Sequence, residues 1–198
     1  MKSSENLVWI DCEMTGLDVE RDCLVEIAVL VTDSELNILD EGLSVVIKPR
    51  EDSLAGMGEF VTNMHRESGL LEQFPDGVSL EQAESKVLDY VKRFAPEART
   101  APLAGNSIGT DRMFINRYMP NLDSHLHYRN VDVSSIKELV RRWYPKVYFQ
   151  LPKKSGGHRA LADIRESIAE LKYYRKTVLV EAPGPTSDEA KASAEQTQ

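Results

Sequence analysis

The chain has 198 residues and a net charge of −8, a size that predicts one domain with a substantial core. Hydrophobic residues make up 41% and charged residues 28%, and no apolar run approaches the ~18 residues of a membrane span. Collagen-like, transmembrane and wholly disordered chains are therefore excluded. The first apolar stretch ends after four residues at Asp11, so it lacks a signal-peptide core, and we expect a cytoplasmic protein without a membrane partner.

The distribution of charge says more about partners than its total does. A net charge of −8 has the wrong sign for a protein that coats long nucleic acids by neutralising phosphates. Residues 129–159, however, hold eight basic and two acidic side chains. This stretch either binds a short anionic ligand or is a solvated helix face and loop. The cysteines, Cys12 and Cys23, match neither a zinc site nor a disulfide scaffold and are interpreted as structural thiols.

Three strands are predicted at the start of the chain. Residues 7–13 form a short apolar run with carboxylates at its end, residues 24–32 are rich in β-branched side chains, and residues 37–48 alternate. Successive strands of this kind suggest an antiparallel meander. Glycines and prolines over residues 50–78 predict loops around one or two short helices.

Strands and helices then alternate. A capping box at residues 79–82 opens a helix that reaches Phe94, and residues 102–106 are a plausible short strand. Further helices are predicted near 111–118, ending before Pro120, from a cap at Ser135 with Glu138 three residues later, and over 160–176. Residues 181–198 have almost nothing to bury and are expected to be disordered. The predicted fold is an α/β domain over residues 1–180 with a mixed sheet.

The first chemical motif is Asp11-Cys12-Glu13 at the end of the first strand. Residues i and i+2 of a strand point to the same face, so the two carboxylates converge while Cys12 turns away. Converging carboxylates suit Mg²⁺ or Mn²⁺, which take hard oxygen ligands. The alternative is an exposed strand end with two solvated acids, against which the preceding apolar run argues.

Two further motifs follow along the chain. His158 stands at the threshold of the last helix and Asp163 lies just inside it, so His158 is suited to accept a proton while Asp163 holds a metal. The alternative is a surface histidine and an acid in a favourable first turn. Asp111, in the Gly-containing strand-to-helix turn 106–111, is either a helix cap or a third site for chemistry.

Taken in order, D-x-E, a mid-chain Asp and H-x-A-x-x-D resemble the signature of the DEDDh 3′–5′ exonucleases, which have a ribonuclease-H-like fold. The segments WIDCEMTGLD, EIAVLVTD, GNSIGTDRMF, HYRNVDVSSIKEL and ALADIRESIAELKYYR closely resemble the oligoribonuclease family, over about residues 6–177. The resemblance implies a ribonuclease-H-like exonuclease fold and hydrolysis of very short RNAs, especially dinucleotides, to mononucleotides. It also implies two divalent ions held by Asp11, Glu13, Asp111 and Asp163, with His158 as general base.

The resemblance implies a substrate site as well. Leu17 corresponds to a leucine that wedges between bases, with Met14 and Thr15 beside it, and Phe60 stands where relatives often carry a stacking Trp. A cap for the 5′ phosphate, completed in the family by a second subunit of a homodimer, matches Ser107, Arg129, Ser134 and Ser135, with Tyr128 next to these positions. The planar guanidinium of Arg129 suits bidentate phosphate binding.

Two other functions compete with this one. A general DEDDh exonuclease, such as a polymerase proofreading subunit, would perform the same chemistry on longer DNA, but the HYR…DVSS segment argues against it. A catalytically silent nucleotide-binding or scaffold protein is disfavoured because all five catalytic-type residues are present.

Overall fold

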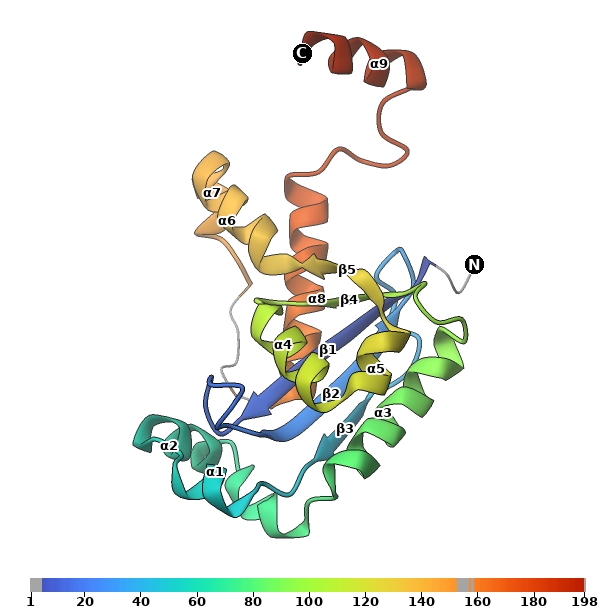
Figure 1. The fold of residues 1–198 in the computed structure, drawn as a ribbon. Helices are drawn as coiled ribbons and strands as arrows, with labels where there is room; N and C mark the ends of the chain where they lie inside the picture. Colours follow the sequence, from blue (N-terminus) through green and yellow to red (C-terminus); the bar gives the residue numbers. More distant parts are fainter. Residues whose placement is uncertain (1–4, 153–156, 158, 198) are drawn as a thin grey trace.

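The computed structural model describes residues 5–152, 157 and 159–197, and it contains a five-stranded sheet with helices on both faces (Figure 1). The strands follow the spatial order β3-β2-β1-β4-β5. Their bounds are Leu7–Met14 for β1, Leu24–Thr32 for β2, Leu43–Val46 for β3, Pro102–Gly105 for β4 and His127–Asp132 for β5. Strands β1, β2 and β3 pair antiparallel, as the predicted meander requires, whereas β4 pairs parallel with both β1 and β5. The predicted mixed sheet is confirmed.

Helices connect and flank these strands. Helix α3 begins at the predicted capping box, in which Ser79 and Gln82 exchange hydrogen bonds. The described helices are α1 (Glu51–Ala55), α2 (Glu59–Glu67), a 3₁₀ helix η2 (Leu71–Asp76), α3 (Leu80–Phe94), α4 (Gly109–Tyr118), α5 (Pro120–His125), α6 (Val133–Trp143), α7 (Pro145–Tyr148), α8 (Ala160–Thr177) and α9 (Ser187–Gln196). None of the helices in these described ranges is long and apolar enough to cross a membrane.

The two faces of β1 pack against different helices. Val8 and Ile10 belong to one buried cluster with residues of α3, α4 and α5, whereas Trp9 belongs to a second cluster with residues of α6 and α8. This division follows from the period of two along a strand. Asp11 and Glu13 share the parity of Trp9, so the sheet directs both carboxylates toward the face that α8 covers.

The predicted strand over residues 37–48 is wrong in its extent, because β3 spans only Leu43–Val46. The Asp33 side chain accepts hydrogen bonds from the backbone nitrogens of Glu35 and Asn37, which form a local turn in place of a ladder. Beyond a single bridge at Ile38, Gly42 adopts a φ of +91° and turns the chain again before β3 starts.

The predicted cap at Ser135 is also wrong. Helix α6 begins at Val133, and Asp132 is its N-cap because its carboxylate accepts from the backbone nitrogen of Ser134. Ser135 consequently lies inside the helix. The preceding strand, β5, has no counterpart among the sequence predictions, since its residues are largely exposed and carry no apolar alternation.

Residues 181–198, predicted to be disordered, contain helix α9, which extends away from the sheet and its helices (Figure 1). A second capping box, formed by Thr186 and Glu189, explains why a helix begins there. None of the residues of α9 is buried, so this helix adds nothing to the hydrophobic core.

Candidate functional site

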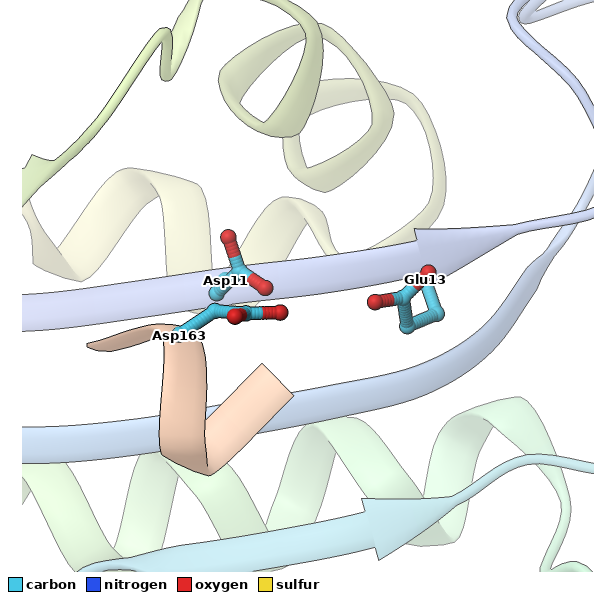
Figure 2. A group of neighbouring side chains, drawn as sticks. All are labelled: Asp11, Glu13 and Asp163. Atoms are coloured by element: carbon cyan, nitrogen blue, oxygen red, sulfur yellow. The ribbon is translucent and has the colours of Figure 1, made fainter. Parts of the chain in front are cut away.

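Three carboxylates converge where β1 meets the first turn of α8. Oxygen atoms of Asp11, Glu13 and Asp163 all lie within 4.8 Å of one another. In Figure 2, Asp11 and Glu13 project from β1 toward Asp163 on α8. The strand period places the first two side chains on one face, as predicted, and the packing of α8 against that face supplies the third.

A fourth acid approaches from α4. Strand β4 pairs with β1 only as far as Trp9, so beyond this point its side of β1 is open to the turn that leads into α4. Asp111, in the first turn of α4, accepts a hydrogen bond of 2.9 Å from the backbone nitrogen of Cys12. Burial raises the pKa of Asp111 to about 6, and this hydrogen bond opposes the rise.

Burial and mutual repulsion shift the pKa values of the first two acids even further. Burial, followed by the charges of Asp111 and Glu13, raises the pKa of Asp11 to about 9. Burial, followed by the charges of Asp163 and Glu26, raises the pKa of Glu13 to about 8. Both carboxylates are thus held in surroundings that disfavour their ionised forms.

This environment fits a divalent cation. The donors are carboxylate oxygens, the hard ligands that Mg²⁺ and Mn²⁺ prefer. The elevated pKa values mean that too little positive charge lies nearby to stabilise the ionised carboxylates. A cation among Asp11, Glu13 and Asp163 would favour the ionised form of each acid, so the three residues form a candidate divalent-metal site.

A buried glutamate that the sequence analysis does not identify ties α8 to the sheet. Glu26 lies opposite Glu13 in the β1–β2 register and is 1% exposed. It accepts hydrogen bonds from the Arg159 guanidinium at 3.0 and 3.3 Å, from Ser44 Oγ at 2.6 Å and from the backbone nitrogen of Ala160 at 3.4 Å. We call the Glu26–Arg159 pair the clasp. The signal available in the sequence is a single charge within an otherwise apolar strand, which requires a buried partner.

Helix α2 is fastened to the end of β1 by another residue without a sequence prediction, the fully buried His65. Its Nε2 lies 2.9 Å from the Met14 carbonyl oxygen, which only accepts, so Nε2 donates. The same helix carries Phe60 in its first turn, with 81% of the residue exposed. Leu17, in the loop after β1, is 74% exposed. Both apolar side chains are available to a ligand near the end of β1.

The residues predicted to form the cap for the 5′ phosphate are only partly brought together. One oxygen of Asp132, Oδ1, accepts from the Ser107 nitrogen at 2.9 Å, the Ser134 nitrogen at 2.9 Å and Ser134 Oγ at 2.7 Å. Ser107 has a φ of +61°, a strained conformation that this bond helps to hold. Asp132 therefore gathers the two serines, although the sequence analysis assigns it no role in the site.

The remaining predicted residues are more dispersed. Tyr128 and Arg129 are exposed, and the Arg129 guanidinium carbon lies 5.6 Å from the centre of the Tyr128 ring. Ser135 is exposed within α6, whereas Thr15 is buried and bonded to Asp22. His158, the predicted general base, lies outside the described residues. Cys12 and Cys23 are buried free thiols, as predicted.

Comparisons with known proteins agree with this geometry. A family profile described as Exonuclease matches residues 8–171. An oligoribonuclease of Leifsonia xyli subsp. xyli is 66% identical, covering 97% of this chain and 93% of that relative. An oligoribonuclease of Streptomyces coelicolor is 59% identical, covering 96% of each chain.

Solved structures share the fold. A metal-free complex of E. coli ExoI with ssDNA superposes with a TM-score of 0.66 at 15% identity, covering 88% of this chain. An exonuclease I from Methylocaldum szegediense gives a TM-score of 0.61 at 19% identity, covering 87% of this chain. The chain spans about two-fifths of each of those longer proteins, namely 40% and 41%. The predicted ribonuclease-H-like exonuclease fold is confirmed.

Proposed function

Because the chain belongs to the oligoribonuclease family of exonucleases, we propose that it removes nucleotides from the 3′ end of short RNAs, with dinucleotides favoured. Water attacks the terminal phosphodiester, the new P–O bond replaces the bond to the 3′ oxygen, and a nucleoside 5′-monophosphate is released. The observation that carries the proposal is the convergence of Asp11, Glu13 and Asp163 within 4.8 Å on the face covered by α8.

The four acids bind metal and His158 transfers a proton. Asp11, Glu13, Asp111 and Asp163 hold two divalent ions, Mg²⁺ or Mn²⁺. When bound, these ions supply Lewis-acid stabilisation of the charge that develops on the phosphate. His158 takes the proton of the attacking water, for which an imidazole is suited near neutral pH.

The exposed apolar residues hold the bases. Leu17 inserts between the two bases and Phe60 stacks on one of them, with Met14 and Thr15 alongside. The exposure of Leu17 and Phe60 in the free protein supports this part of the proposal, because apolar side chains gain by leaving water on substrate binding. We further propose that residues 1–180 form the exonuclease domain, a range that contains the family match.

A cap limits the length of the substrate. Ser107, Arg129, Ser134 and Ser135 bind the 5′ phosphate of a dinucleotide with Tyr128 beside them, and a second subunit completes the cap in a homodimer. Support for a second subunit comes from apolar side chains exposed at the end of α6 and after α7, where Trp143 is 65% exposed and Phe149 is 77% exposed. Analytical ultracentrifugation, expected to show a dimer, tests this part. A location in the cytoplasm stays a prediction of the sequence.

The proposal predicts metal-dependent shortening of RNA from its 3′ end. With 5′-labelled short RNAs, the wild type is expected to shorten the label-bearing strand one nucleotide at a time, and a chelator to abolish the reaction. Asp163→Asn should lower kcat by about a thousandfold or more, since one metal ligand is lost.

Asp188→Asn is the matched control, because Asp188 also lies in the first turn of a helix, α9, which extends away from the sheet that carries Asp11 and Glu13 (Figure 1). It should leave the rate unchanged. Product formation that survives chelation, or near-normal turnover by Asp163→Asn with an intact circular dichroism spectrum, would refute the proposed role of the acids.

A further inference from the structure

The loop between β1 and β2 is built around Asp22. Its carboxylate accepts hydrogen bonds from Thr15 Oγ1 at 3.0 Å and from the Asp18 nitrogen at 2.9 Å, so it joins the two arms of the loop. Gly16 packs directly against this carboxylate, and a Cβ there would collide with it. The loop therefore has a defined internal structure at the point where Leu17 projects into solvent.

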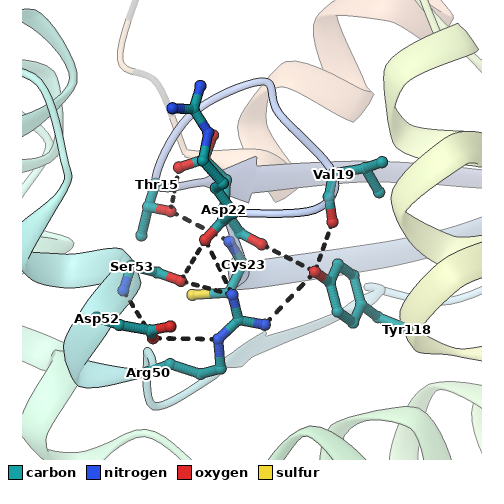
Figure 3. A network of polar contacts seen from close by, with 9 residues as sticks. Thr15, Val19, Asp22, Cys23, Arg50, Asp52, Ser53 and Tyr118 are labelled. Atoms are coloured by element: carbon teal, nitrogen blue, oxygen red, sulfur yellow. Dashed lines mark hydrogen bonds and ion pairs between the residues drawn. The ribbon is translucent and has the colours of Figure 1, made fainter.

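Side chains of α4 and of the start of α1 form hydrogen bonds with backbone atoms of the same loop (Figure 3). Tyr118, the last residue of α4, donates its hydroxyl hydrogen to the Val19 carbonyl oxygen at 2.6 Å. The Arg21 carbonyl oxygen accepts from Arg50 Nη2 at 2.9 Å and from Ser53 Oγ at 2.7 Å. Arg50 and Ser53 stand at the start of α1. These contacts recognise main-chain atoms, so they fix the path of the loop.

The Tyr118 hydroxyl also contacts Arg50, one of the two residues that bond to the Arg21 carbonyl oxygen. Arg50 Nη1 lies 3.4 Å from the hydroxyl oxygen, and the Asp22 carbonyl oxygen lies 3.1 Å from it. A hydroxyl has one hydrogen to donate, and the shorter distance assigns that hydrogen to Val19. Donation to Val19 and acceptance from Arg50 together link the α4 and α1 contacts into one network.

Helix α4 relates this network to the acids. At its first turn Asp111 binds the backbone nitrogen of Cys12, and at its last residue Tyr118 binds the loop that leads on from the same strand. The helix thus contacts β1 among the acids and the following loop beyond them. Leu17, between these two attachments, is held at a set place relative to Asp11 and Glu13.

We propose that Tyr118, Arg50 and Ser53 act as positioning residues that hold the Leu17 loop in register with the acids and thereby determine the preference for dinucleotides. The proposal rests on the proposed function, in which Leu17 contacts the bases. The three side chains bond to carbonyl oxygens of the loop backbone, and their effect passes through Leu17.

The test compares hydrolysis of a 5′-phosphorylated RNA dinucleotide and heptanucleotide by wild type and Tyr118→Phe. The variant keeps the ring that packs beside Phe114 and loses the bond to Val19. Loss of one such bond is expected to raise KM for the dinucleotide about fivefold to tenfold, with kcat within about twofold of wild type. Tyr173→Phe is the matched control, since the Tyr173 hydroxyl donates to the Val147 carbonyl oxygen at 3.0 Å, away from the loop.

A double variant separates positioning from general stability. Leu17→Ala should raise KM by itself, and adding Tyr118→Phe should raise it little further, because both changes act on one interaction. Ser53→Ala, which removes a different donor to the loop, should resemble Tyr118→Phe. An unchanged KM in Tyr118→Phe, or full additivity with Leu17→Ala, would overturn the proposal.

Failure of the proposed function would be recognisable separately. In that case the wild type would show no preference for the dinucleotide and Leu17→Ala would leave KM unaltered. If instead the wild type prefers the dinucleotide and Leu17→Ala weakens binding, while Tyr118→Phe does not, only the positioning role is wrong.

Discussion

Individual carboxylates at this site carry a stability cost that a bound cation relieves. Asp11 and Glu13 have ordinary pKa values of 3.8 and 4.5, which the fold raises to about 9 and about 8. Between the ordinary and the raised values, the folded chain binds more protons than the unfolded chain. The free energy of unfolding must therefore fall as the pH rises through this window, from about pH 4 to about pH 9.

This linkage predicts the thermal stability of the metal-free protein. With a chelator present, Tm should be lower at pH 9 than at pH 6, and Asp11→Asn should remove part of the decrease. Since one pKa unit is about 1.4 kcal/mol and 1 kcal/mol shifts Tm by about 2–4 °C at this size, the variant should gain about 5 °C or more at pH 9.

Differential scanning calorimetry measures both effects. Mg²⁺ or Mn²⁺ should raise the Tm of the wild type more at pH 9 than at pH 6, and raise that of Asp11→Asn less. Asp188→Asn, which removes an exposed acid in α9, should follow the wild type at both pH values. A Tm difference between wild type and Asp11→Asn that is the same at pH 6 and pH 9 would contradict the electrostatic argument.

At the scale of elements, the first turn of α8 depends on the clasp. Arg159, just before α8, pairs with the buried Glu26 of β2, so the clasp fixes where this turn meets the sheet. Arg159→Met keeps the side-chain stem but leaves Glu26 without its guanidinium partner. We expect kcat to fall about a hundredfold, because a displacement of about 1 Å in a catalytic group can cost that much.

Arg165→Met on the same helix is the control, since Arg165 donates to the carbonyl oxygen of the exposed Glu41. Loss of one partner of a buried pair also costs about 3–5 kcal/mol of stability. Adding Glu26→Gln should recover stability without recovering kcat. If Arg159→Met retains wild-type kcat, α8 is positioned by packing alone.

The elements differ in how far the sequence predicts them. The sequence gives β2 its observed bounds and α3 its observed start, because apolar runs and capping boxes are local signals. It misses β5 and misplaces the start of α6, where a carboxylate at Asp132 competes with a plausible serine cap. The turn after Asp33 similarly shortens the third strand through side-chain bonds to the backbone.

The candidate site, like the elements, is predictable from the sequence where the signal is local and not where it depends on tertiary packing. The shared face of Asp11 and Glu13 follows from the strand period, whereas the approach of Asp163 depends on tertiary packing that only the family resemblance anticipates. Glu26 and Asp132 escape prediction because each has a partner that is distant in sequence. Arg159 is 133 positions from Glu26, and Ser107 is 25 positions from Asp132.

At the scale of the whole molecule, an acidic chain is compatible with a nucleic-acid substrate if that substrate is short. A dinucleotide with one or two phosphates releases few counterions, so a long basic groove is unnecessary. The net charge of −8 then disfavours long strands. Substrate length is accordingly the property that most clearly distinguishes this protein from an exonuclease for long DNA.

The most direct measurement is a competition assay of kcat/KM. Wild type and Arg129→Ala are each incubated with Mg²⁺ and equal concentrations of a 5′-phosphorylated RNA dinucleotide and heptanucleotide. For the wild type, kcat/KM for the dinucleotide should exceed that for the heptanucleotide about tenfold or more, since charge-assisted bonds to a phosphate are worth about 1.5–3 kcal/mol. Arg129→Ala should lose most of this preference. Equal values for both lengths, unaffected by the substitution, would contradict the cap and leave an exonuclease without length preference.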